Sequence, residues 1–146
     1  DNGVPVTECD DPEAPDGSRL PVTPKFKGNL TGRYTFDVGS NEAFVQGALV
    51  HVGERLADLR TAEQAILGDL PSYTTLDISA GFRKDDWMID VYVANATDER
   101  GELSHFTQCA ESVCGAAGVV PQYPNGQIYT LTNQPRSFGI RFSQSF

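Results

Sequence analysis

The sequence predicts an all-β protein whose roughly five antiparallel strands form the C-terminal part of a large transmembrane β-barrel, not a complete barrel. Three observations support this fold class. Apolar and polar residues alternate along several segments, no long apolar run occurs, and the connections between the alternating segments are short and long in turn.

The composition agrees with strands and turns better than with long helices. Of the 146 residues, 39% are hydrophobic, and 14 Gly with 9 Pro indicate many turns. No run approaches the roughly 18 to 20 apolar residues of a spanning helix, whereas a membrane strand needs only about 9 to 11 residues with alternate ones apolar. The net charge of −9 argues against a nucleic-acid partner.

Period-two alternation, which places neighbouring side chains on opposite faces of a sheet, marks the individual strands. In residues 25–36, the even positions are apolar or small and the odd positions are polar. Residues 74–83, 87–94 and 137–146 alternate in the same way, while residues 43–53 are rich in strand formers but have mixed faces. The expected strands cover residues 25–37, 43–54, 73–83, 87–95 and 135–146.

The connections suggest which way the strands run through a membrane. Residues 37–42 and 84–86 are short, whereas residues 55–72 and 96–134 are long polar segments. Outer-membrane barrels have short periplasmic turns and long extracellular loops. We therefore expect residues 1–24 (a loop remnant), 55–72 and 96–134 to be extracellular, and Phe146 to end the chain on the periplasmic side. A short helix within residues 54–67 and a strand extension at residues 126–132 are expected in the loops.

The segments that alternate also resemble the C-terminal end of TonB-dependent outer-membrane receptors, over residues 17–146. The resemblance implies a barrel of about 22 strands, in the bacterial outer membrane, filled by an N-terminal plug domain. It implies active import of a scarce nutrient (siderophore, vitamin, glycan or similar) driven by the TonB–ExbB–ExbD system. The segments that carry it are GSRLPVTPKFKGNLTGRYTF (17–36), PSYTTLDISAGFRKDDWMIDVYVANATDER (71–100) and PRSFGIRFSQSF (135–146).

Two groups of residues follow from the strands and the resemblance. The polar faces are expected to point into the lumen, where the resemblance implies contact with the plug; their charges are Lys25, Lys27, Arg33, Asp77, Arg83, Asp90 and Arg141. The last strand resembles the signal read by the barrel-assembly machinery, and its apolar row faces lipid; this row is Phe138, Ile140, Phe142 and Phe146. The remaining strands of the same barrel are the other expected partner, because five strands leave two open edges.

The three cysteines suggest an oxidising compartment. Cys109 and Cys114 lie close enough in sequence for a local disulfide, and both fall in an expected extracellular loop. Cys9 is left unpaired or linked to a partner upstream.

Catalytic, cofactor and metal motifs are missing from the sequence. There is no HExxH, GxSxG, P-loop or GxGxxG pattern, so we expect no enzyme, no cofactor and no metal site. The stretch Asn-Ala-Thr-Asp at residues 95–98 is better explained by a turn than by cation binding. Besides the receptor, a passive porin-like barrel and a secreted soluble β-sandwich that binds a ligand stay open, since alternation also suits a sandwich.

Overall fold

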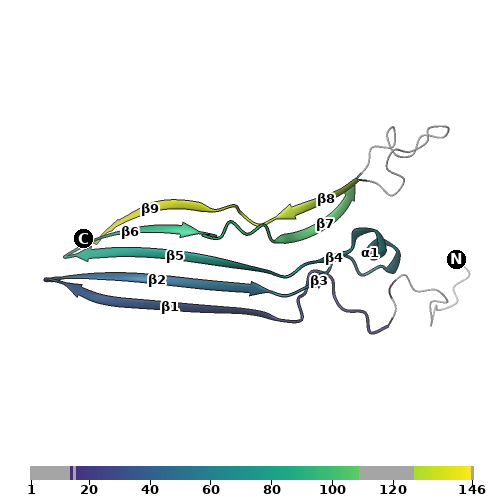
Figure 1. The fold of residues 1–146 in the computed structure, drawn as a ribbon, viewed down its shortest axis with the longest axis horizontal. Helices are drawn as coiled ribbons and strands as arrows, with labels where there is room; N and C mark the ends of the chain where they lie inside the picture. The colour runs from purple at the N-terminus through teal and green to yellow at the C-terminus, as the bar shows by residue number, and fades with distance from the viewer. Residues whose placement is uncertain (1–13, 15, 109–126, 146) are drawn as a thin grey trace, which may run out of the picture.

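The computed structural model describes residues 14, 16–108 and 127–145 of the chain. Five long strands form one antiparallel sheet with the order β1-β2-β5-β6-β9 (Figure 1). Among the described residues, no helix is long and apolar enough to cross a membrane. The five strands are β1 (Lys27–Val38), β2 (Asn41–Val52), β5 (Tyr73–Lys84), β6 (Trp87–Ala94) and β9 (Ser137–Gln144).

Smaller elements extend one end of this sheet. They comprise β3 (Arg55–Leu56), α1 (Thr61–Leu67) and β4 (Asp69–Leu70), then β7 (Glu102–Gln108) and β8 (Gln127–Thr132). Strands β3 and β4 pair with each other, as do β7 and β8. The all-β, antiparallel fold class predicted from the sequence is confirmed.

The observed strand bounds lie within two residues of the expected ones wherever the structure describes them. One difference affects a predicted site residue: β1 begins at Lys27, so Lys25 lies before the strand. The reason is local, because Pro24 has no N–H to donate to a strand ladder and therefore favours a strand start beyond it. The segment expected as one loop over residues 96–134 also contains a strand that the sequence did not indicate, β7.

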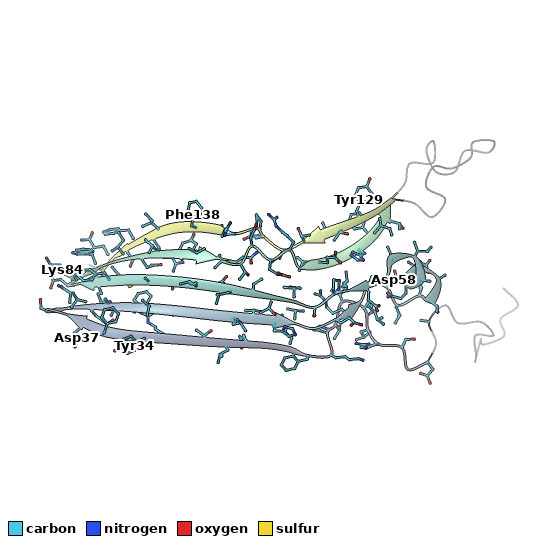
Figure 2. All side chains as sticks on the ribbon, in the orientation of Figure 1. Tyr34, Asp37, Asp58, Lys84, Tyr129 and Phe138 are labelled. Carbon is cyan, nitrogen blue, oxygen red and sulfur yellow. The ribbon has the colours of Figure 1, made fainter. Side chains whose placement is uncertain are left out.

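Short and long connections lie at opposite ends of the sheet. Two-residue turns join β1 to β2 and β5 to β6, and positive φ at Gly39 (67°) and Asp85 (49°) allows chain reversals this tight. Figure 1 shows both turns beside the end of β9, with α1, β3, β4, β7 and β8 at the far end. In Figure 2, Asp37 and Lys84 mark the turn end, while Asp58 and Tyr129 lie at the loop end.

The strand register sorts the side chains into two faces, which we name the apolar face and the polar face. In β2, the mixed pattern becomes clear: Val45 and Leu49 belong to the apolar face, while Phe44 belongs to the polar face beside Glu42. The apolar face comprises Leu30, Tyr34, Phe36, Ala43, Val45, Leu49, Leu76, Ile78, Ala80, Phe82, Trp87, Ile89, Val91, Val93, Phe138, Ile140 and Phe142.

The apolar face is uncovered by any other part of the described chain. Its largest side chains, such as Phe138 and Ile140, are 83% and 71% exposed. A soluble protein rarely leaves so large an apolar surface open, so this face requires an apolar environment. Its aromatic rings gather near the turn end, where Trp87 lies 6.3 Å from Phe82 and 6.4 Å from Phe142 between ring centroids.

A buried aromatic ring gives the polar face its tightest packing. The Phe44 ring lies over Gly81, its cross-strand partner, and the guanidinium of Arg33 lies 3.6 Å from the ring centroid. A Cβ on Gly81 would meet the ring and the Cβ of Asp90 at once. Glycine is therefore required here for close approach of the ring to the backbone.

We expect Gly81→Ala to lower the free energy of unfolding of the intact protein by about 1–3 kcal/mol, because the added methyl group overpacks the site. Gly47→Ala is the matched control, since a Cβ there has nothing within 4 Å. Denaturant titrations of both variants measure the difference. Equal effects of the two substitutions would show that the Phe44 ring does not restrict residue 81.

Candidate functional site: the polar face and the turn at its loop end

The structure places six of the seven predicted charged residues on the polar face. Cross-strand pairing puts Arg33 beside Gln46 and Asp90 between Gly81 and Arg141. Lys25 lies outside the strand and has no place in this register. The six predicted charges found there are Lys27, Arg33, Asp77, Arg83, Asp90 and Arg141, and Asp37 and Glu42 lie on the same face.

A second aromatic ring repeats the arrangement of Phe44 further along the sheet. The Tyr92 ring lies across its partner Gly139, and the guanidinium of Arg141 lies 5.4 Å from the ring centroid. Arg141 also approaches Asp90, with 3.9 Å between Nη1 and Oδ2. The polar face is therefore built from flat rings lying over glycines, with arginines held against the rings by cation–π attraction.

Beside the Tyr92 ring the polar face is hollowed. The hollow, which we name the wall hollow, has a volume of about 210 Å³. Small side chains such as Ser79 and Ala48 lie among larger polar ones, which leaves this space open. Its polar lining comes from Gln46, Asp77, Ser79, Asp90, Tyr92 and Arg141.

A turn at the end of β6 connects this strand to β5 and to the segment between β8 and β9 at the loop end of the sheet. Its centre is Asn95, which is 5% exposed and has a positive φ of 49°. The Asn95 side-chain amide donates to the carbonyl oxygens of Glu99 (2.9 Å) and Gln134 (3.0 Å), and its oxygen accepts the Glu99 N–H (2.9 Å). The Asn95 N–H donates to Oδ1 of Asp77 (2.8 Å). The prediction of a turn stabilised by Asn and Asp side chains is thus confirmed.

Asp98 connects the same turn to Arg136, which precedes β9. Its Oδ1 accepts the Arg136 N–H at 2.9 Å, and Arg100 lies 3.4 Å away. The hydrogen bond from the Arg136 backbone, helped by the charges of Arg100 and Arg136, lowers the pKa of the Asp98 carboxyl below its ordinary 3.8. The turn therefore ties β6 to the segment that leads into β9.

The lowered pKa of Asp98 has a consequence for acid solutions. A carboxyl group whose pKa is lowered in the folded protein stabilises the fold at any pH above its ordinary pKa. This stabilisation is lost as the pH falls from the ordinary pKa through the lowered pKa. Below pH 3.8 we expect the Arg136 amide to exchange hydrogen faster, relative to its intrinsic rate. The reference is the Ala96 amide, because its hydrogen-bond acceptor is the Leu76 carbonyl oxygen and not a carboxylate. In Asp98→Ala, exchange at Arg136 should be fast at every pH; protection equal to wild type would contradict the assignment.

Hydrogen bonds connect the two long connections, the one between β2 and β5 and the one between β6 and β9, at the loop end of the sheet. The His105 ring contacts the Leu67 carbonyl oxygen (2.8 Å) at the end of α1 and the Glu102 carboxylate (3.0 Å). The guanidinium of Arg55, 4% exposed, donates to the Glu102 carbonyl oxygen (2.7 Å) and lies over the Tyr73 ring. The loop end is therefore one packed unit, which the sequence did not reveal because its partners lie far apart in the chain.

Several predicted sites lie outside the described residues, namely Cys9, Cys109, Cys114 and Phe146. The Cys109–Cys114 disulfide, the state of Cys9 and the role of Phe146 stay predictions. The other members of the apolar row, Phe138, Ile140 and Phe142, lie on the exposed apolar face of β9. In the part of the chain that the structure describes, no group of three or more His, Cys, Asp or Glu is placed to hold a metal.

The chain matches a known protein family. A family model described as a TonB-dependent receptor-like β-barrel matches residues 2–96, well over half of the chain. The match ends at the Asn95 turn, and β9 continues the same sheet beyond it by pairing with β6. Comparisons with curated proteins and with solved structures find no significant match.

Proposed function

The chain belongs to the family of TonB-dependent receptor-like β-barrels, and on that premise we propose that it forms part of a receptor that binds a scarce nutrient and imports it actively. Proteins of this family are outer-membrane receptors of bacteria and are transporters, not enzymes. The nutrient would be a siderophore, a vitamin, a glycan or a similar compound. Energy would come from the TonB–ExbB–ExbD system, which would act through a plug domain.

The observation that carries this proposal is the sheet with two unlike faces. One face is apolar and open across five strands, while the other carries the six predicted charges together with Asp37 and Glu42. In a barrel of this family, the apolar face meets lipid and the polar face lines the lumen. The aromatic cluster around Trp87 then lies at the membrane interface, where such rings are favoured.

The ends of the sheet would follow the same orientation. The two-residue turns would face the periplasm, and the unit of α1, β3, β4, β7 and β8 would stand outside the cell. Short periplasmic turns and long extracellular loops are the rule in such barrels. The residues expected as extracellular, 1–24, 55–72 and 96–134, keep that assignment as a proposal.

The proposed partners follow from the two edge strands and the two exposed faces of the sheet. Within the described residues, β1 and β9 each pair with a single neighbour, and unpaired strand edges are not tolerated in lipid. The remaining strands of the same barrel would pair with both edges, and the plug would contact the polar face. The exposed apolar row of β9 would present the strand to the barrel-assembly machinery and then to outer-membrane lipid.

Uptake by cells that carry the intact receptor tests the import function. The probes are a ferric siderophore, a corrinoid vitamin and an oligosaccharide, each radiolabelled and supplied at nanomolar concentration. We expect at least one of them to accumulate only when both the receptor and TonB are present. Accumulation that does not depend on TonB, together with steady ion conductance of the purified receptor in planar bilayers, would identify a passive porin instead.

A further inference from the structure

Three neighbouring strands carry side chains in regular rows on the apolar face. The register aligns β5, β6 and β9, so every second position of each strand falls into a common row on this face. From the loop end towards the turn end, the rows are Ile78, Val93 and Phe138; Ala80, Val91 and Ile140; Phe82, Ile89 and Phe142; and Lys84, Trp87 and Gln144. Figure 2 shows Phe138 and Lys84 at opposite ends of these rows. Three apolar rows therefore lead to one row that carries a charge and two N–H groups.

A groove crosses the apolar rows, because Ala80 is much smaller than the side chains around it. A hollow of about 320 Å³ lies between β5, β6 and β9 beside Ala80 and Val91. A second hollow of about 300 Å³ continues past these two residues to Phe82 and Ile89. Since the two hollows share Ala80 and Val91, they form one channel, which we name the outer groove.

The last row places polar groups beside the turn end of the outer groove. Lys84 is exposed and lies across from Trp87, which pairs in turn with Gln144. The Lys84 ammonium, the Trp87 indole N–H and the Gln144 side-chain amide make no ion pair or hydrogen bond with any described residue. All three groups are donors, and one is positively charged. This row therefore suits an anionic group with several acceptor oxygens.

The two carboxylates next to Lys84 in the sequence do not neutralise it. Asp85 and Asp86 line a hollow at the turn together with Arg83 and Ser143, which belong to the polar face. Lys84 does not line this hollow. Within the described ranges, no carboxylate makes an ion pair with Lys84. Its charge is therefore available on the apolar side of the sheet.

The spacing between Lys84 and the outer groove fits a single leaflet of a membrane. Lys84 follows Ala80 by four positions, which is roughly 14 Å along an antiparallel strand. At the usual strand tilt of about 35–45° this becomes roughly 10–11 Å of depth. One leaflet supplies about half of the ~30 Å hydrocarbon core, or roughly 15 Å. A lipid whose headgroup lies at Lys84 therefore reaches the outer groove with its acyl chain.

We propose that the outer wall binds one glycerophospholipid of the leaflet at the turn end, with its phosphate at Lys84 and one acyl chain in the outer groove. The proposal rests on the function proposed above, which places the apolar face in lipid and the turn end at the periplasm. Lys84 attracts the phosphate, and the Trp87 indole lies at the level of the ester groups. The chain fills the space beside Ala80, where an unfilled gap would lose dispersion contacts.

Native mass spectrometry of the intact receptor in mild detergent tests the phosphate contact. The probes are phosphatidylglycerol and phosphatidylcholine with the same acyl chains. We expect the first phosphatidylglycerol to bind more tightly, because the choline headgroup neutralises its own phosphate. Lys84→Gln should weaken phosphatidylglycerol binding about fivefold, the usual contribution of one basic residue at an anionic lipid surface, and Lys84→Arg should retain it.

Lys27→Gln is the matched control, since Lys27 lies at the loop end of the polar face. It should leave the affinity for phosphatidylglycerol unchanged. An affinity of Lys84→Gln equal to that of wild type, or equal binding of the two lipids by wild type, would overturn the phosphate contact.

Photolabelling of the intact receptor in lipid vesicles tests the outer groove. The probe is phosphatidylglycerol with a diazirine in the middle of one acyl chain, and we expect it to label β5 and β6 more strongly than β1 and β2. Ala80→Phe fills the groove and should lower this labelling about tenfold, because about two methylene groups lose their contacts. Leu49→Phe adds a ring on the same face outside the groove and should leave the labelling unchanged.

Two outcomes of the photolabelling would overturn the acyl-chain site. Equal labelling of Ala80→Phe and Leu49→Phe would show that the groove does not hold the chain. Even labelling of all five strands in wild type would show an adventitious lipid only. Heat-modifiable mobility on gels confirms that each variant is folded.

These measurements separate the lipid site from the import function. Neither of them needs TonB or a transported compound. Selective lipid binding in a receptor without TonB-dependent uptake would count against import alone. Intact TonB-dependent uptake, with Lys84→Gln and Ala80→Phe binding lipid as wild type does, would remove the lipid site and leave the import function standing.

Discussion

Ile78→Arg is expected to destabilise the membrane-inserted barrel by about 2–4 kcal/mol, the cost of a charge on the lipid face near the midplane. Ile78 lies on the central strand β5 and is 47% exposed on the apolar face. Its neighbours across the sheet, Gly47 and Val93, offer no counter-charge. The arginine must therefore stay unpaired in lipid or distort the bilayer around it.

The control is an arginine on the same strand with the opposite orientation. Thr75 faces the polar side beside Val50, so Thr75→Arg should cost less than about 1 kcal/mol. Denaturant unfolding of the intact receptor in lipid vesicles gives both values. If the two arginines cost the same, the apolar face does not contact lipid and the barrel orientation is wrong.

Asn95→Ala is expected to lower the free energy of unfolding by about 3 kcal/mol or more, since each buried group left without a partner costs about 1–3 kcal/mol. The substitution removes both side-chain donors and the acceptor that hold Glu99 and Gln134. It also places alanine at a φ of 49°, a conformation that asparagine tolerates better. Hydrogen exchange at the Glu99 amide should rise together with the loss of stability.

Two further variants help to interpret the loss of stability in Asn95→Ala: one separates backbone strain from the lost hydrogen bonds, and the other is a control. Asn95→Gly removes the same hydrogen bonds but accepts the positive φ, so the difference between glycine and alanine measures the backbone strain. Asn29→Ala, at an exposed position of β1, should change stability by less than about 0.5 kcal/mol. A loss at Asn95 no larger than the loss at Asn29 would show that the turn does not hold the strands.

Local features of the sequence were sufficient for the strands but not for their mutual packing. Alternation identified the polar-face charges from Lys27 to Arg141, because facing depends only on residue parity within a strand. The same rule gave no clear answer in β2, where Phe44 is apolar but lies on the polar face beneath Arg33. The ring belongs there because Gly81, 37 positions later in the numbering, leaves room for it.

In the turn at Asn95, too, the local bonds could be predicted from the sequence and the long-range bond could not. Asn95 and Asp98, three positions apart, predicted a turn stabilised by side chains, and the two hydrogen bonds between Asn95 and Glu99 agree. The bond to Gln134, 39 positions away, could not be predicted from neighbouring residues. Strand β7 was missed for a related reason, since its residues alternate poorly and it is defined by pairing with β8.

The sequence by itself determined the fold class, the approximate strands, the sharp turns and the two unlike faces of the sheet. These depend on local periodicity and on residues that favour turns, which act over a few positions of the chain. Only the tertiary structure decided the register, and with it the burial of Asp90 and the space of the wall hollow. Register brings Gln46, Ser79 and Tyr92 into one row from three strands, and such proximity depends on backbone pairing between distant segments.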